Sequence, residues 1–245
     1  MRWFWYASPQ TFYPLAGKIA RACAVLAALL TVAGLYVGFV VAPTDAQQGE
    51  AYRIIFIHVP AAWMSMFIYL VMAFWAAMGL AFNTRLSGMM ATALAPTGAL
   101  FTFLALWTGS LWGKPTWGTY WVWDARLTSE LILLFLYLGF IALVNAIDDV
   151  VRGDKAAAVL ALIGAVNIPI IYFSVRWWNT LHQGATISVA KAPSMAQTML
   201  VAMLLMTFAF WAYAFAVVFT RAQALALERE RDTDWVRSLG VGKGA

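Results

Sequence analysis

Long uncharged stretches alternate with short polar segments along the whole chain. Charged side chains are absent from residues 22–44, 54–84, 86–113, 156–175 and 192–220, and Glu130 is the single one within 127–147. A helix needs about 20 mostly apolar residues to cross a hydrocarbon core about 30 Å thick. Because lipid offers the backbone no hydrogen-bond partner, such segments cross as helices rather than as open strands. The pattern predicts six transmembrane helices, at residues 20–42, 55–82, 89–109, 127–147, 157–177 and 196–220.

Composition supports the same class of protein. Hydrophobic residues make up 63% of the 245 residues and charged residues only 11%, whereas a soluble domain carries roughly 25% charge. No linker separates domains, so we expect an all-α polytopic membrane protein with one six-helix domain over residues 1–245. The chain has no G-x-x-x-x-G-K motif for ATP, and its single cysteine, Cys23, excludes an internal disulfide and a C-x-x-C-H haem attachment.

The basic residues predict the orientation. With six spans, one side of the membrane receives eleven of the 16 Lys and Arg residues, namely Arg2, Lys18, Arg21, Arg85, Arg152, Lys155, Arg221, Arg229, Arg231, Arg237 and Lys243. The other side receives Arg53, Lys114, Arg126, Arg176 and Lys191. Since cytoplasmic loops carry the excess of Lys and Arg, we expect both termini to be cytoplasmic. The net charge of +5 then belongs to cytoplasmic flanks rather than to a nucleic-acid surface.

The two histidines of the chain fall on the same predicted side, the external one. His58 lies about one turn inside the second span, and His182 follows the end of the fifth. Imidazole is a preferred axial ligand of haem iron, and two elements at similar depth suit a flat ligand held between them. The alternative is that each histidine is an interfacial residue that makes ordinary hydrogen bonds.

A tryptophan-rich loop at residues 110–126 lies between the third and fourth spans. Four Trp and one Tyr fall within 112–123, interleaved with glycines and a proline. Aromatic belts at the headgroup level are common, but this density also predicts a flat apolar platform for a planar macrocycle. Trp117 and Trp121 are four residues apart and share a face if the stretch is helical.

Polar residues near the loop have structural and functional interpretations. Asp124 immediately precedes the fourth span, where a carboxylate caps a helix. Arg126, Lys114, Arg53 and Arg176 are candidates to pair with propionates, or else extend to the membrane surface as interfacial cations. Glu130 is an intramembrane carboxylate and so a functional candidate, unless Thr128, Ser129 or Arg126 satisfies it.

Three segments together resemble a known family. The run WGKPTWGTYWVWDARLTSELILLFLY resembles the "WWD" signature of haem-handling membrane proteins. With IHVPAAW, WWNTLHQG and six spans, the chain resembles the CcmC family, haem exporter protein C of bacterial cytochrome c maturation. The larger CcmF and CcsA-type relatives have more spans and further histidines.

The resemblance implies a site and a pathway. It implies that His58 and His182 are the axial ligands of a non-covalent haem b, and that the platform contacts come from Trp112, Gly113, Trp117, Gly118, Trp121, Trp123 and Asp124. It further implies that the protein resides in the bacterial inner membrane and presents haem on the periplasmic side to the chaperone CcmE. The implied partners are the ABC transporter CcmA/CcmB and the small subunit CcmD. A haem-delivery protein is expected rather than a stand-alone enzyme.

Two other functions stay open at this point. The first is a structural or permease subunit of an ABC-type haem transport complex, in which the aromatic loops only anchor the protein at the interface. The second is a haem channel, which needs polar residues along a path through the bilayer. The spans offer few, namely Glu130, Asn145 and Asn167, with Pro169 as a candidate kink.

Overall fold

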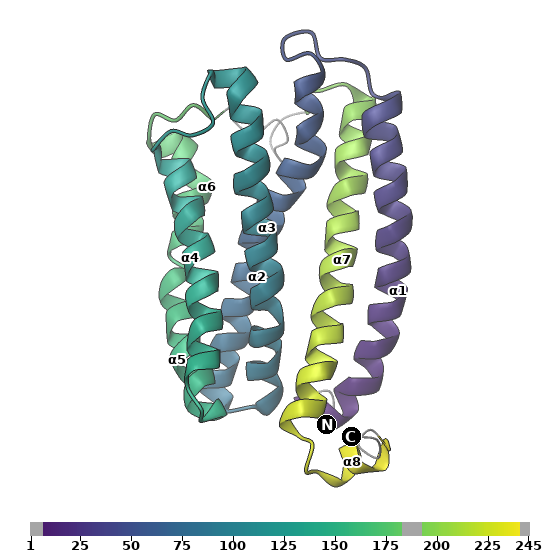
Figure 1. Ribbon diagram of the computed structural model, residues 1–245, viewed down its shortest axis with the longest axis vertical. Helices are drawn as coiled ribbons and strands as arrows, with labels where there is room; N and C mark the ends of the chain where they lie inside the picture. The colour runs from purple at the N-terminus through teal and green to yellow at the C-terminus, as the bar shows by residue number, and fades with distance from the viewer. Residues whose placement is uncertain (1–6, 183–192, 241–245) are drawn as a thin grey trace.

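The protein is a bundle of long helices, seen in a computed structural model that describes residues 7–182 and 193–240 (Figure 1). Six helical spans are long and apolar enough to cross a membrane, which confirms the predicted all-α polytopic class. Within the described ranges there is no β-strand, only an isolated bridge between Asp45 and Gly49. The elements are α1 (Pro9–Tyr36), η2 (Val37–Val41), η3 (Glu50–Ile54), α2 (Ile55–Phe82), α3 (Arg85–Trp117), α4 (Ala125–Ala146), α5 (Val150–Gly164), α6 (Asn167–Trp177), α7 (Gln197–Arg229) and α8 (Asp234–Ser238).

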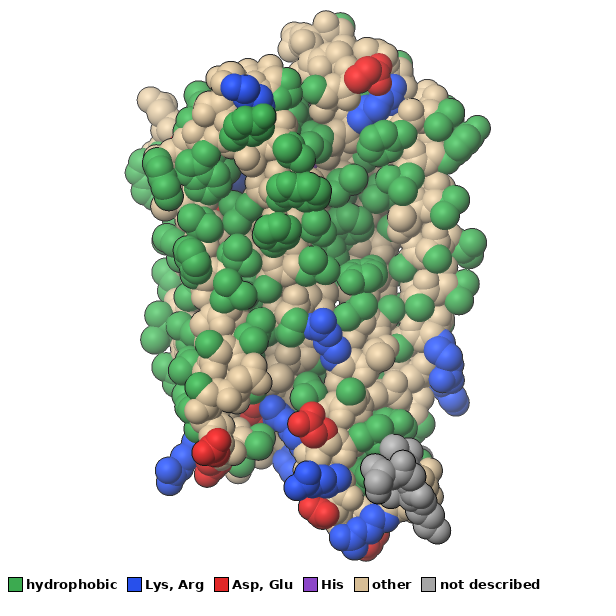
Figure 2. Space-filling view, in the orientation of Figure 1, with side chains coloured by type: hydrophobic (Ala, Val, Ile, Leu, Met, Phe, Trp, Pro, Cys, Tyr) green, Lys and Arg blue, Asp and Glu red, His purple; other side chains and the backbone are tan. Residues whose placement is uncertain are grey.

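The helices alternate in direction, so their connections gather at two ends. The described parts nearest both termini lie at the same end as the α2–α3 and α4–α5 connections (Figure 1). We call this the basic end. The opposite end comprises residues 42–58, 108–126 and 177–182, and we call it the aromatic end. Figure 2 shows a broad hydrophobic band in the middle of the bundle. Most of the visible charged side chains lie outside this band, at the two ends.

Four of the six predicted spans have clearly different boundaries: α7 continues to Arg229 rather than ending at residue 220, and the other three differ for local reasons. α1 begins at Pro9 rather than at residue 20. Ser8 is extended at the N-cap and Pro9 is the first helical residue, a position that proline favours, and the residues that follow are less apolar than the predicted span. α3 continues to Trp117, through the first part of the tryptophan-rich segment, and ends where Gly118 adopts a left-handed φ of 78°. The predicted span 157–177 is divided into α5 and α6, because the ring of Pro169 conflicts with the carbonyl four residues earlier.

The main core lies between α2, α3, α4 and α5. Tyr69 and Tyr137 are fully buried there and meet edge to face, with ring centroids 5.0 Å apart. The hydroxyl of Tyr137 donates a 2.8 Å hydrogen bond to the carbonyl of Ser65, which satisfies its polar atom inside the core. α1 packs mainly against α7, and a second cluster around Phe56 and Met206 joins these two helices to the start of α2.

Candidate functional site

The connection between α1 and α2 fixes where α2 begins at the aromatic end. Tyr52 in η3 is buried, and its hydroxyl donates a 2.6 Å hydrogen bond to the carbonyl of Pro43. The guanidinium of Arg53 donates to the carbonyls of Gly38 and Ala42 and pairs with Glu50. These bonds tie η3 to the end of the first span and so hold the first turn of α2, which carries His58.

His58 is oriented by α3. Its Nδ1 lies 3.1 Å from the hydroxyl oxygen of Thr108. That hydroxyl donates its single hydrogen to the carbonyl of Leu104, so it accepts from Nδ1–H of the imidazole. The lone pair of His58 is thereby on Nε2, the nitrogen available to a metal. Gly109 permits this approach, because a Cβ there would lie 2.9 Å from Cε1 of His58.

The last two turns of α3 place two tryptophans against the two histidines. Trp112 meets His58 edge to face with centroids 5.6 Å apart, and its indole N–H donates a 2.8 Å hydrogen bond to Gln48. Trp117 meets His182 with centroids 4.9 Å apart. The end of one helix therefore contacts both histidines.

His182 is mostly buried and faces a carboxylate. Its Nδ1 lies 3.8 Å from Oδ2 of Asp124, and the two side chains are 18% and 10% exposed. Burial, and then the nearby Arg126 guanidinium, lower the pKa of His182 to about 4, against the opposing influence of Asp124. The imidazole is therefore neutral near pH 7, which is the form that binds metal ions.

Asp124 has a role on each of its carboxylate oxygens. Oδ1 accepts a 2.8 Å hydrogen bond from the backbone N–H of Leu127 and caps α4, as predicted. Oδ2 is buried, faces His182 and has no hydrogen-bond partner among the described residues. The carboxylate thus links the start of α4 to the position of His182.

The remaining residues of the tryptophan-rich segment are Gly113 inside α3 and the residues from Gly118 onward, which are not helical before α4. Gly118 ends α3, and Gly113 is buried where a Cβ would lie 3.0 Å from both the carbonyl of Thr119 and the ring of Trp117. Trp121 and Trp123 meet edge to face at 5.4 Å. Because α3 ends at Trp117, Trp117 and Trp121 do not share a helical face, and Trp123 is 76% exposed. Gln183 and Gly184 of the predicted motif lie outside the described residues.

Comparison with known proteins identifies the family. The family model described as Heme exporter protein C, CcmC, matches residues 2–237. The chain belongs to the CcmC family. Proteins named Heme exporter protein C from Haemophilus influenzae, Escherichia coli K12 and Bradyrhizobium diazoefficiens are 49%, 54% and 50% identical over 209, 180 and 203 residues. These alignments cover 84%, 74% and 83% of this chain and 85%, 74% and 77% of the relatives.

The four candidate cations of this CcmC-family chain differ in what they contact. Arg53 is already paired with Glu50 and with the carbonyls of Gly38 and Ala42. Lys114 lies over the ring of Tyr120 and donates a hydrogen bond to the carbonyl of Gly118. Arg176 is exposed beside Phe173. Arg126 is half-buried, donates a 2.8 Å hydrogen bond to the carbonyl of Ile171, and interacts electrostatically with both His58 and His182.

Several residues that shape the site are not apparent from the sequence. Thr108 and Gln48 hold His58 and Trp112, although each is at least fifty positions from its partner in the chain. Glu130 is buried, and its Oε1 accepts a 2.7 Å hydrogen bond from Ser65 rather than from Thr128 or Ser129. Such contacts between helices leave no periodic signal, because they depend on how α2, α3 and α4 pack.

Proposed function

We propose that this protein binds haem at the aromatic end, between His58 and His182, and presents it to a partner during maturation of c-type cytochromes. The observation that carries the proposal is that both histidines lie at one end of the bundle, each against a tryptophan from the end of α3. The names of the relatives, haem exporters, support haem as the cargo.

The protonation of the two imidazoles fits axial ligation. Thr108 directs Nδ1–H of His58 away from the site and leaves the lone pair on Nε2. Asp124 is positioned to do the same for His182, since it faces Nδ1 of that ring. A carboxylate or hydroxyl behind a ligating histidine fixes the ring and raises its basicity. When bound, haem supplies an iron that accepts two such nitrogen ligands.

Unpaired buried atoms also indicate a missing ligand at this end. Nδ1 of His182, Oδ2 of Asp124, Nε1 of Trp121 and Oγ1 of Thr180 are buried without hydrogen-bond partners in the described part of the chain. Buried polar atoms are rarely left unpaired in a complete native site. A bound propionate would offer acceptors to the indole N–H of Trp121 and the hydroxyl of Thr180, and a small shift would bring Nδ1–H of His182 onto Oδ2 of Asp124.

Arg126 is the cation best placed to bind a propionate. A guanidinium binds a carboxylate through two parallel hydrogen bonds, and only one of its nitrogens is used by the carbonyl of Ile171 among the described contacts. Its electrostatic influence on both histidines supports a position beside the ligand. The protein's part is therefore to hold and orient haem b without a covalent bond.

The surroundings of the site suit delivery. The exposed indole of Trp123 and the exposed ring of Tyr120 provide an apolar surface next to the site, to which the chaperone CcmE would bind on the periplasmic side of the inner membrane. In the same proposal the ABC subunits CcmA and CcmB, with CcmD, complete an exporter complex. Holding both reactants in place accelerates a bond-forming step, so this chain contributes position rather than a nucleophile.

The ligand assignment is tested with purified protein and its haem spectrum. His58→Ala and His182→Ala should each lose or shift the Soret band, and added imidazole should restore it by filling the vacated coordination position. Trp211→Ala is the matched control, because this half-exposed ring stacks on Phe67 away from the site. Wild-type spectra in both histidine variants would exclude axial ligation.

Delivery is tested separately in vesicles. Haem-loaded protein should transfer haem to added apo-CcmE, and Tyr120→Ala should slow transfer while the haem spectrum stays unchanged. If haem binds but never reaches CcmE, the binding proposal stands and the delivery proposal is wrong.

A further inference from the structure

Glu130 of α4 is buried without a cation in direct contact. Among the described residues two glutamates are buried, Glu130 at 6% and Glu230 at 5% exposure. Oε1 of Glu130 accepts a hydrogen bond from Ser65, whereas Oε2 is buried without a hydrogen-bond partner in the described part of the chain. An unpaired carboxylate inside a membrane span is costly and is a functional candidate by default. The placement of Glu130 therefore points to a role beyond packing.

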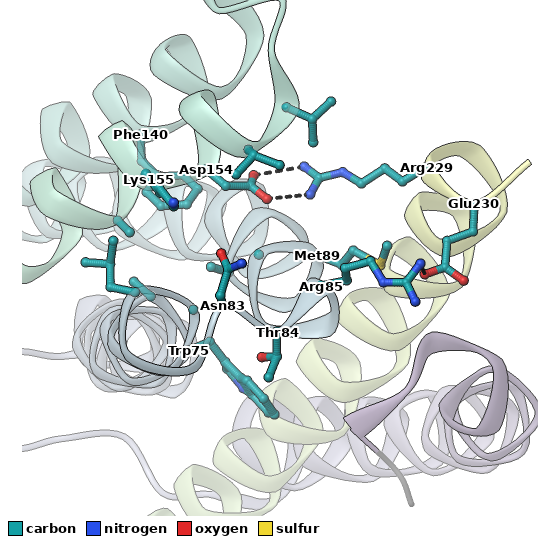
Figure 3. A pocket seen from close by; sticks show the side chains of 18 residues that line it. Trp75, Asn83, Thr84, Arg85, Met89, Phe140, Asp154, Lys155, Arg229 and Glu230 are labelled. Atoms are coloured by element: carbon teal, nitrogen blue, oxygen red, sulfur yellow. Dashed lines mark hydrogen bonds and ion pairs between the residues drawn. The ribbon is translucent and has the colours of Figure 1, made fainter. Parts of the chain in front are cut away.

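The acidic side chains at the basic end provide the contrast. Glu230 pairs with Arg85 at 3.0 Å. Asp154 holds Arg229 through two hydrogen bonds of 2.7 and 3.1 Å (Figure 3). All four side chains line a pocket of about 310 Å³. Each of these two carboxylates thus contacts an arginine from another helix, and Glu130 differs from both.

The cation nearest to Glu130 along α4 is Arg126, one helical turn before it. Side chains of an α-helix lean toward its N-terminus, and α4 begins at the aromatic end, so the side chain of Glu130 leans toward the turn that carries Arg126. Residues four apart on a helix have Cβ atoms about 5–6 Å from each other. The guanidinium of Arg126 accordingly acts electrostatically on Glu130. The carboxylate lies on the buried side of this half-buried arginine.

Glu130 is held in place from α2, the helix that carries His58. The hydroxyl of Ser65 donates a 2.7 Å hydrogen bond to Oε1 of Glu130, and Ser65 is fully buried. The hydroxyl of Tyr137 donates to the carbonyl of the same serine at 2.8 Å. Ser65 lies about two turns beyond His58 on the same face of α2, because an α-helix has 3.6 residues per turn. The carboxylate is thus fixed below the site and on its side of α2.

Arg126 can extend outward or fold inward. A long basic side chain near a helix end can reach the membrane surface with its charged group. Here the guanidinium is folded inward and donates one hydrogen bond to the carbonyl of Ile171, a contact that contributes only about 1 kcal/mol on average. A carboxylate one turn deeper adds an attraction that acts in the same direction and is stronger where water is scarce.

We propose that Glu130 is a positioning residue that keeps the guanidinium of Arg126 beside His58 and His182, where it binds a haem propionate. This inference rests on the haem site proposed above. Glu130 acts through Arg126 and does not itself contact haem. The nitrogens of Arg126 that Ile171 does not use are then directed at the propionate, which a guanidinium binds as a fork.

The test compares haem with its dimethyl ester, in which both propionates are uncharged. Glu130→Gln keeps the shape of the side chain and an acceptor for Ser65, but removes the charge. In titrations of detergent-purified protein, this variant should bind haem about tenfold more weakly, the effect of losing one hydrogen bond between charged groups. Its affinity for the dimethyl ester should equal that of wild type. In an Arg126→Gln background, Glu130→Gln should have no further effect on haem affinity.

A second readout needs no haem. Phenylglyoxal modifies accessible arginines, and peptide mass spectrometry measures its rate at Arg126. Glu130→Gln should raise that rate severalfold, because the guanidinium then extends outward. Tyr137→Phe is the matched control, since it removes another hydrogen bond between α4 and Ser65 without changing the charge. It should leave the labelling rate and the haem affinity at their wild-type values.

The outcomes separate this inference from the proposed haem site. If Glu130→Gln weakens haem and its dimethyl ester equally, binds haem as wild type does or more tightly, or leaves the labelling of Arg126 unchanged, Glu130 is not the positioning residue, although the haem site stands. If wild type binds no haem but the labelling of Arg126 responds to Glu130→Gln, the haem site is wrong and the control of Arg126 by Glu130 stands.

Discussion

At the scale of single residues, the candidate site depends on side chains with two simultaneous contacts. Thr108 donates to Leu104 and accepts from His58, and Asp124 caps α4 while it faces His182. Each of these residues therefore contacts both the backbone of a helix and the Nδ1 atom of a histidine. Substitutions that remove only one of the two contacts should therefore change either the stability of the protein or its affinity for haem.

Substitution of Asp124 makes this separation measurable. Asn caps helices about as well as Asp, so Asp124→Asn should leave the melting temperature nearly unchanged. Without a carboxylate behind His182, haem affinity should fall about tenfold. Asp124→Ala should lose the same affinity and in addition about 1 kcal/mol of stability. Haem titration and thermal unfolding measure the two effects, and wild-type affinity in Asp124→Asn would contradict the role of the carboxylate.

At the scale of elements, α3 is central because it contacts α2, α4 and α7. The ring of Tyr137 from α4 packs directly against Gly98. A Cβ at position 98 would lie 2.1 Å from that ring. Tyr137 is fully buried and tied to Ser65 of α2, so it has little freedom to move. The close approach of α3 and α4 thus requires a glycine at this position.

Gly98→Ala should consequently destabilise the bundle by about 1–3 kcal/mol, the usual effect of overpacking a core. Gly79→Ala in α2 is the control, because its Cβ would be an ordinary 3.5 Å from Ser87 and alanine favours a helix by up to about 1 kcal/mol. Unfolding in a denaturing detergent titration compares the two variants. Equal stability would mean that α3 and α4 are less tightly packed than described.

The helices were largely predictable from the sequence, whereas their ends and contacts were not. Uncharged runs located all six spans, since burial in lipid acts on every residue of a span. The extension of α3 to Trp117 was missed because Gly113 and Pro115 resemble a loop, although only Gly118 adopts a left-handed conformation there. The capping role of Asp124 was predictable because it depends on neighbours in sequence, but Thr108 and Gln48 act across helices.

At the scale of the whole molecule, the arrangement separates two chemically different ends. The tryptophan-rich segment and both histidines lie at one end, and most of the described Lys and Arg residues lie at the other. The excess of basic residues predicts that the latter is cytoplasmic. The candidate haem site then faces the periplasm.

Single-cysteine labelling checks this orientation. In a Cys23→Ala background, Tyr120→Cys at the aromatic end should react with a membrane-impermeant maleimide on intact spheroplasts. Ser238→Cys in α8 should react only after permeabilisation, although both positions are exposed. The reverse pattern would place the candidate site in the cytoplasm.

The pairing of α1 with α7 has a consequence for biosynthesis. α1 packs mainly against α7 and leaves the ribosome before it, so its principal neighbour does not yet exist while the intervening helices are inserted. During that interval lipid rather than α7 surrounds most of α1. The exposed hydrophobic side chains of Leu29, Val32 and Tyr36 are compatible with contact with lipid. Assembly can finish only after translation has produced the C-terminal region. A ribosome stalled before α7 would therefore leave the length of α1 uncovered, held to the rest of the bundle only near its end, where Arg53 binds the carbonyls of Gly38 and Ala42.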